Sequence, residues 1–310
     1  MTVTPRTWLV TGASGLFGRA FCEAALARGD DVVGVRHIRA LDVPGVREIS
    51  FRLDKADDVR AFVADVRPDV IVHAAGITDV DACERDEPAA ERLHVDATGV
   101  LAVAARASGA RFVYISTDHL WDGTVCNVTE EEPTRPLNAY ARTKLAGEAV
   151  ALEAAPDGLV VRTNFFGDGP PWRPSFSDWV VSSLDRGDTI RAFADVHFTP
   201  ISLGHLSEAL LDLTSGEISG VLHVAGRERL SKLDFVQRLA AAVGMPGDIV
   251  AASVRDAELA APRPRDMSLD CSLAAAHLGR PLPDVAEGFA TLARVVTHAA
   301  PNSHDPNEDT

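Results

Sequence analysis

The feature that most constrains the fold is a glycine-rich turn near the start of the chain. Residues 7–26 read TWLVTGASGLFGRAFCEAAL: an apolar run leads into a turn with Gly12, Gly15 and Gly18, and then into apolar residues at helical spacing. Glycines let the backbone approach a pyrophosphate, and the first N–H groups of the new helix face the anion. Because the spacing is GxxGxxG rather than GxGxxG, an ordinary glycine-rich turn is the alternative, and the context must decide.

The remainder of the first half alternates short apolar runs with helical patterns. Strands are expected at residues 31–35, 48–53, 69–75, 111–116 and 158–163, and helices at 57–66, 88–108 and 138–154. Repeated strand–helix–strand units with short connections predict an α/β, Rossmann-like, doubly wound parallel sheet. Ligands then lie beyond the carboxyl ends of the strands.

The pattern becomes less regular after residue 165. A Gly/Pro-rich loop occupies residues 167–174, and helices are expected near 202–213, 231–243 and 284–298. We predict an NADP-binding domain over residues 1–165, to which some later strands and helices return, and a smaller α/β substrate-binding lobe mainly over 166–298. The polar residues 299–310 predict a disordered tail.

Composition excludes several functional classes. The 310 residues are 46% hydrophobic, enough for a large core, and the formal net charge is −15 with 27 arginines and three lysines scattered along the chain, so neither nucleic acid nor an anionic membrane is an expected partner. We find no transmembrane run or signal peptide and expect a cytoplasmic protein. The four cysteines and ten histidines show no metal-binding spacing, so no metal site is predicted.

Basic residues follow the second predicted strand. In a dinucleotide fold this strand end reaches the adenosine ribose, where an acidic residue accepts from the 2′-OH and Arg pairs with a 2′-phosphate. The chain offers Arg36, His37 and Arg39 there. We therefore predict NADP rather than NAD, with Arg36 as the first candidate and Arg39 as the second.

The strongest chemical signal is Tyr140 followed by Lys144 on a predicted helix. Residues i and i+4 share one face, so the phenol and the ammonium can approach the same point. An ammonium, with a bound nicotinamide, is expected to lower the pKa of the tyrosine and let it exchange a proton. Ser116 and Thr117 end the preceding strand, where a hydroxyl can hold the substrate oxygen.

These motifs carry a family resemblance. The segments TGASGLFG, HAAG, STDHLWDG and YARTKLAGE, with FTPIS at residues 198–202 and APRPRDMSLD at 261–270, resemble the extended short-chain dehydrogenase/reductase superfamily and, within it, the dTDP-4-dehydrorhamnose reductase branch. The resemblance covers roughly residues 6–297 and implies hydride delivery from NADPH to the ketone of a nucleotide-activated 4-keto-6-deoxysugar. It makes Tyr140 the general acid, Lys144 its activator and a ribose ligand, and Thr117 the third catalytic group.

The resemblance also implies two sets of binding residues. Those for NADP(H) come from the turn, the strand ends and the catalytic helix: Gly12, Ser14, Gly15, Leu16, Phe17, Gly18, Arg36, His37, Arg39, Leu53, Asp54, Ala74, Ala75, Gly76, Ser116, Tyr140, Lys144, Thr163, Asn164 and Phe165. Those for the sugar substrate are Thr78, Thr117, Asp118, His119, Tyr140, Phe165 and Arg263. Whether the chain forms a homodimer is left open.

Three departures from the branch concern the substrate and the proton path. His119 stands where the branch usually has Tyr, Phe165 where it often has Trp, and His94 where many relatives have Asn.

Two alternatives to a reductase remain. A nucleotide-sugar epimerase or dehydratase would hold NAD, against which Arg36 and the single carboxylate of Asp118 argue. A non-catalytic NADP-binding subunit, like the regulatory subunit of methionine adenosyltransferase, would keep the same motifs.

Overall fold

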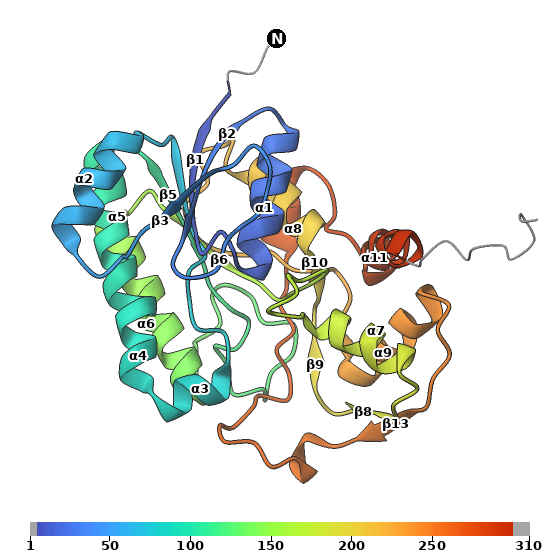
Figure 1. Ribbon diagram of the computed structural model, residues 1–310. Helices are drawn as coiled ribbons and strands as arrows, with labels where there is room; N and C mark the ends of the chain where they lie inside the picture. Colours follow the sequence, from blue (N-terminus) through green and yellow to red (C-terminus); the bar gives the residue numbers. More distant parts are fainter. Residues whose placement is uncertain (1–4, 300–310) are drawn as a thin grey trace, which may run out of the picture.

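A seven-stranded parallel sheet forms the centre of the protein (Figure 1). The computed structural model describes residues 5–299, with side chains described to residue 293. The strand order is β11-β6-β5-β4-β1-β2-β3, and every neighbouring pair is parallel. The strands are β1 (Thr7–Thr11), β2 (Asp31–Arg36), β3 (Arg47–Ser50), β4 (Val70–His73), β5 (Arg111–Ile115), β6 (Leu159–Arg162) and β11 (Gly220–His223). The predicted Rossmann-like α/β fold is confirmed.

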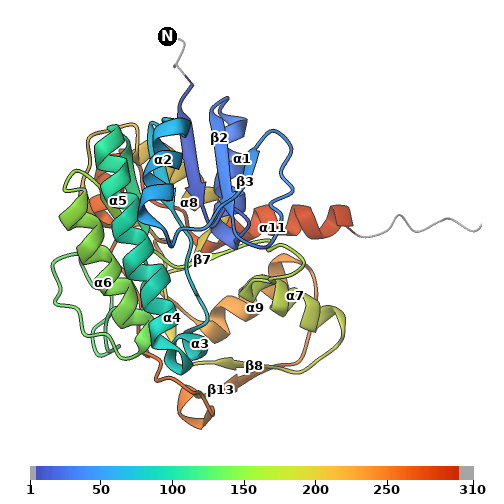
Figure 2. The same cartoon turned by 60° about the vertical axis from the view of Figure 1, so that its left-hand side comes forward.

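Helices cover both faces of the sheet (Figure 2). Along β1, Trp8 and Val10 face one apolar cluster and Leu9 faces the other, which explains the continuous apolar runs of the central strands. The first cluster takes residues from α1 (Leu16–Ala27), α8 (Leu203–Leu213) and α10 (Ser272–Leu278). The second takes residues from α2 (Ala56–Val66), α5 (Ala97–Ser108) and α6 (Ala139–Ala154).

The helix predicted at residues 88–108 is divided into three parts. It begins as α4 (Glu87–Glu91), passes through a π-helical turn, η1 (Arg92–Asp96), and continues as α5, while α3 (Val80–Arg85) precedes it. The wide π turn carries His94, whose side chain is fully buried beside the candidate site. Such turns are frequent at functional sites.

A second, smaller core lies beside the carboxyl edge of the sheet; we call the part of the protein around it the second, smaller lobe, and the part around the central sheet the first lobe. It gathers α7 (Phe176–Asp185), α9 (Lys232–Ala242) and the described part of α11 (Val285–Ala299) around Phe166 and Phe235. Three two-stranded pairs complete it: β7 (Phe165–Phe166) with β10 (Ile201–Ser202), β9 (His197–Phe198) with β12 (Leu230–Ser231), and β8 (Ile190–Phe193) with β13 (Ile249–Ala252). A short 3-10 helix, η2 (Val254–Asp256), follows β13.

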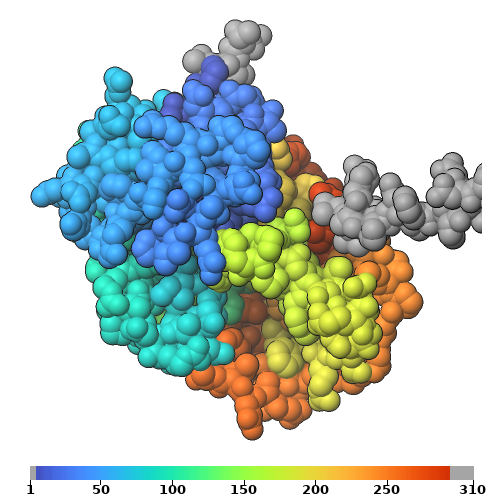
Figure 3. Space-filling model, in the orientation of Figure 1, coloured from blue at the N-terminus to red at the C-terminus, as the bar shows by residue number. Residues whose placement is uncertain are grey.

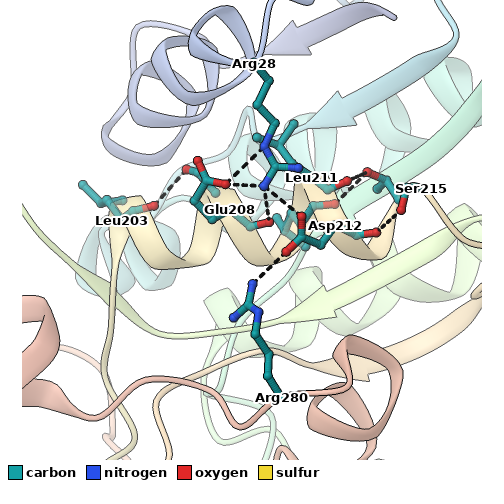
Figure 4. A network of polar contacts seen from close by, with 10 residues as sticks. Arg28, Leu203, Glu208, Leu211, Asp212, Ser215 and Arg280 are labelled. Carbon is teal, nitrogen blue, oxygen red and sulfur yellow. Dashed lines mark hydrogen bonds and ion pairs between the residues drawn. The ribbon is translucent and has the colours of Figure 1, made fainter. Parts of the chain in front are cut away.

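The chain returns from the smaller lobe to the central sheet through α8 and β11. On the surface, Arg28 at the end of α1 pairs with Glu208 and Asp212 of α8, and Arg280 donates to Asp212 at 2.7 Å (Figure 4). All four side chains are more than one third exposed, so the apolar packing between α1 and α8 contributes most of this contact's stability.

The third strand ends earlier than predicted. The edge strand β3 ends at Ser50, so Leu53 and Asp54 lie in a loop, because an edge strand has only one neighbour to continue its ladder. Of the tail predicted at residues 299–310, only Ala299 is described, as the last residue of α11; the rest lies outside the described residues.

Across residues 5–299, none of the helices combines the length and apolar character needed to cross a membrane.

Candidate active site

A cavity of about 880 Å³ runs along the carboxyl ends of the strands. Its volume is within the range of small-molecule and cofactor sites. Figure 3 shows the surface hollowed between the teal atoms of the first lobe and the yellow-green and orange atoms of the second. The wall includes every residue predicted for NADP(H) and every residue predicted for the substrate except Arg263.

The glycine turn forms one end of this cavity. Gly12 has φ +67°, and a Cβ on it would lie 2.6 Å from the backbone nitrogen of Ala75, so a side chain cannot be placed there without a backbone shift. Gly15 is the N-cap of α1, and that helix start has neither a side-chain cap nor an acidic residue in its first turn. The first N–H groups of α1 are therefore available for an anion, as a dinucleotide pyrophosphate requires.

Tyr140 and Lys144 lie on the first two turns of α6, which begins at the N-cap Asn138. Both side chains are buried and line the cavity. The Nζ of Lys144 donates to the carbonyl of Ile115 at 2.6 Å and lies 4.1 Å from the centre of the Tyr114 ring. Burial lowers the pKa of Lys144 to about 7.

The pKa of Tyr140 differs from the sequence-based expectation. Burial raises it well above its usual value of 10, and the strongest opposing effect is a hydrogen bond with Thr117. Lys144, which was predicted to lower this pKa, is not among its main causes, because its Nζ is directed to Ile115 and Tyr114. The phenol is therefore protonated at neutral pH.

The Ser-Thr-Asp segment that follows β5 forms the neighbouring wall. Asp118 is buried, accepts from Asn164 at 2.6 Å and from Thr117 at 3.3 Å, and has a pKa raised by burial. Lys232 of the second lobe opposes that shift. The ring of His119 meets Tyr140 edge-on at 5.6 Å, and burial lowers its pKa to about 3, so the imidazole is neutral.

Three residues predicted to bind the cofactor or the substrate have side chains paired with other groups of the protein. Arg36 forms an ion pair with Glu48, although it lines the cavity. Ser116 donates to Glu148, which is paired with Arg162 behind the cavity. Arg263 lies outside the cavity wall: its guanidinium donates to Asp81 at 2.9 Å and to the Ala261 carbonyl at 2.8 Å. Its contact with a substrate stays a prediction.

The Gly/Pro-rich loop predicted at residues 167–174, which we call the strap, was not expected to contribute to the site. Trp172, Arg173 and Pro174 of the strap line the cavity. The Trp172 ring lies under the Arg39 guanidinium, 5.8 Å from it, and Arg173 donates to Thr78. A Trp-Arg pair in a Gly/Pro loop directly after a strand end is a signal that could have identified it.

His94 joins the loop after β4 to the helix that carries Tyr140. Its Nε2 lies 2.9 Å from the Ile77 nitrogen and accepts that N–H, which leaves the proton on Nδ1, 2.9 Å from Thr143 Oγ1. Its ring also meets Tyr140 edge-on at 5.9 Å. Burial lowers its pKa to about 3. A neutral imidazole with both nitrogens engaged positions the loop against α6.

We expect His94→Asn to weaken the acid sensitivity of the fold. Above pH 6.5 the folded and unfolded imidazoles are both neutral; as the pH falls toward 3, only the unfolded one gains a proton, so stability is lost. This group then accounts for about 2 kcal/mol of the stability lost between pH 7.5 and pH 5. Urea unfolding of both proteins at these two pH values measures the difference.

The exposed His277 supplies the matched control, since His277→Asn removes an imidazole without touching this network. If His94→Asn loses as much stability between pH 7.5 and pH 5 as the wild type does, His94 is not the source of this acid sensitivity. Lower stability of His94→Asn at pH 7.5 is also expected, because the two hydrogen bonds of the imidazole are lost.

Comparison with known proteins identifies relatives over nearly the whole chain. Residues 6–298 match the family described as RmlD substrate binding domain. The chain is 32% identical to a dTDP-4-dehydrorhamnose reductase of Mycolicibacterium smegmatis (96% of this chain, 88% of that protein) and 30% identical to a probable low-salt glycan biosynthesis reductase of Haloferax volcanii (91% and 96%). It is 31% identical to methionine adenosyltransferase 2 subunit beta of Pongo abelii (88% and 82%).

Solved structures agree with the fold. A hypothetical dTDP-4-dehydrorhamnose reductase from Sulfolobus tokodaii superposes with a TM-score of 0.81 at 32% identity, covering 91% of this chain and 98% of that one. A dTDP-4-dehydrorhamnose reductase from Bacillus anthracis, in complex with NADP, has a TM-score of 0.81 at 22% identity and covers 93% and 99%. The second likeness concerns the fold alone.

Proposed function

The chain belongs to the RmlD substrate binding domain family, and from this premise we propose that it is an NADPH-dependent reductase of a nucleotide-activated 4-keto-6-deoxysugar. One observation carries the proposal: Tyr140, Thr117 and Lys144 line the same cavity as the turn at Gly12. A proton donor thus shares one space with a cradle suited to a dinucleotide pyrophosphate.

The residues of this chain would act as follows. The phenol of Tyr140, held protonated by its raised pKa, donates a proton to the ketone oxygen, and the Thr117 hydroxyl holds that oxygen. Lys144 would hold the ribose of the cofactor. NADPH, when bound, supplies the hydride.

The uncapped start of α1 and the close approach at Gly12 support a dinucleotide in the cavity. Arg39, which follows β2 on the cavity wall, favours NADP(H) over NAD. Tightly held NAD in the purified protein would instead favour an epimerase or dehydratase.

The direct test mixes the purified protein with NADPH and a panel of nucleotide sugars, scored by cofactor oxidation. We expect oxidation with a nucleotide 4-keto-6-deoxysugar such as dTDP-4-dehydrorhamnose. Tight NADPH binding without turnover of any nucleotide ketosugar would remove the assignment.

A second candidate is a non-catalytic subunit that binds NADP. It is supported by the similarity to methionine adenosyltransferase 2 subunit beta. A stoichiometric complex with a methionine adenosyltransferase, together with absent ketone reduction, would favour this candidate.

A further inference from the structure

We propose that Arg39, which lies over the ring of Trp172 of the strap, selects the 2′-phosphate of the cofactor, and that Arg36 does not. The inference rests on the proposed function only in requiring a dinucleotide in this cavity. It reverses the order expected from the sequence, where Arg36 comes first after β2. The reason lies in the different partners of the two guanidinium groups.

Arg36 is already neutralised. Its Nε is ion-paired with Glu48, whose other carboxylate oxygen accepts from the Leu41 nitrogen at 2.8 Å. The Arg36 contact is the main cause of a lowered pKa for Glu48, which is therefore ionised at neutral pH. A phosphate brought to Arg36 would meet this carboxylate, so it would have to displace Glu48 from both contacts or accept its repulsion.

Arg39 carries an uncompensated charge. Among the side chains of residues 5–293 no carboxylate is paired with it, and its guanidinium lies 5.8 Å from the centre of the Trp172 ring. A cation–π contact uses the charge of a guanidinium and none of its N–H donors. Those donors are free to bind a phosphate with two parallel hydrogen bonds.

The other charged side chains near this strand end do not compete. Arg52 and Asp54, which also line the cavity, pair with each other at 2.6 Å. Arg39 is therefore the cation after β2 that has no acidic partner among the described residues, and it lies on the cavity wall.

Trp172 links this selection to the second lobe. The strap leaves β7, is held at Gly169 by the Asp178 carboxylate at 2.9 Å, and reaches the first lobe at Arg39 and at Thr78. Figure 3 shows the yellow-green atoms of this region against the blue atoms of the first lobe. A 2′-phosphate held by Arg39 would thus lie next to the strap, on the same wall of the cavity.

The test compares ligands that differ by this one phosphate. Calorimetric titration of the full chain with 2′,5′-ADP and with 5′-AMP isolates its contribution, and NADPH against NADH repeats the comparison on whole cofactors. Variants Arg39→Ala, Arg36→Ala and Trp172→Ala are compared with Trp179→Ala, a partly exposed tryptophan outside the cavity wall.

Arg39→Ala should weaken 2′,5′-ADP binding by about tenfold or more and leave 5′-AMP within about twofold. Trp172→Ala should lose part of the preference for 2′,5′-ADP over 5′-AMP, and Trp179→Ala should keep that preference in full. The inference is overturned if Arg36→Ala abolishes the preference while Arg39→Ala retains it, or if the wild type shows no preference. A phosphate preference that depends on Arg39, in a protein that reduces no ketosugar, would support this inference and reject the proposed activity.

Discussion

Replacing Tyr140 by Phe is expected to lower kcat of the proposed reduction by about 10²- to 10⁴-fold, the usual contribution of a positioned acid. The substitution removes only the hydroxyl that hydrogen-bonds Thr117 and leaves the ring between His94 and His119. The dissociation constant for NADPH should stay within about threefold, since the lost group acts in the transition state. Steady-state kinetics and a fluorescence titration with NADPH measure the two quantities.

The only other tyrosine of the chain provides the control. Tyr114 is fully buried outside the cavity wall, and its hydroxyl donates to the His94 carbonyl at 3.3 Å. Tyr114→Phe should reduce stability slightly and keep most of kcat. Comparable kcat in Tyr140→Phe and the wild type would reject Tyr140 as the proton donor.

Replacing Glu148 by Ala is expected to destabilise the fold by about 3–5 kcal/mol. Glu148 of α6 pairs with Arg162 of β6 at 2.7 Å, and both side chains are less than 10% exposed. Removing the carboxylate leaves a buried guanidinium without a counter-charge, and Arg162 already has one buried nitrogen, Nη1, without a partner. Urea unfolding followed by circular dichroism gives the change in the free energy of unfolding.

The exposed pair of Arg28 and Glu208 is the matched control (Figure 4). Glu208→Ala should cost about 1 kcal/mol or less, because water screens this pair and Arg28 keeps Asp212. The double variant Glu148→Met/Arg162→Met should recover much of the loss, since apolar residues need no counter-charge. A loss as small in Glu148→Ala as in Glu208→Ala would refute the role assigned to the buried pair.

Much of the fold follows from local patterns. The central strands are continuous apolar runs because Trp8, Leu9 and Val10 are buried on both faces of the sheet. Tyr140 and Lys144 could be placed on one helix face from their spacing alone. Helix ends were predicted within one or two residues where a cap marks them, as at Asn138 and Ser231.

The π turn at His94 and the return of α8 and β11 to the sheet were not predicted in place. One wide turn hardly changes the helical spacing of apolar residues, so the sequence signal for a π turn at residues 92–96 is weak. The position of β11 next to β6 depends on packing between segments about 60 residues apart. The residues within β11 carry no information on which distant strand it will pair with.

By itself, the sequence determined the α/β fold, the glycine turn and the Tyr-Lys helix, because backbone conformation and side-chain periodicity depend on neighbouring residues. Only the tertiary structure decided which arginine after β2 is neutralised: Glu48 reaches Arg36 from the adjacent strand, and Trp172 reaches Arg39 from the other lobe. Partners far apart in the chain meet only when the sheet and the second lobe are assembled. Their charges and pKa values are set at that stage, since burial and the nearest counter-charge exist only in the packed molecule.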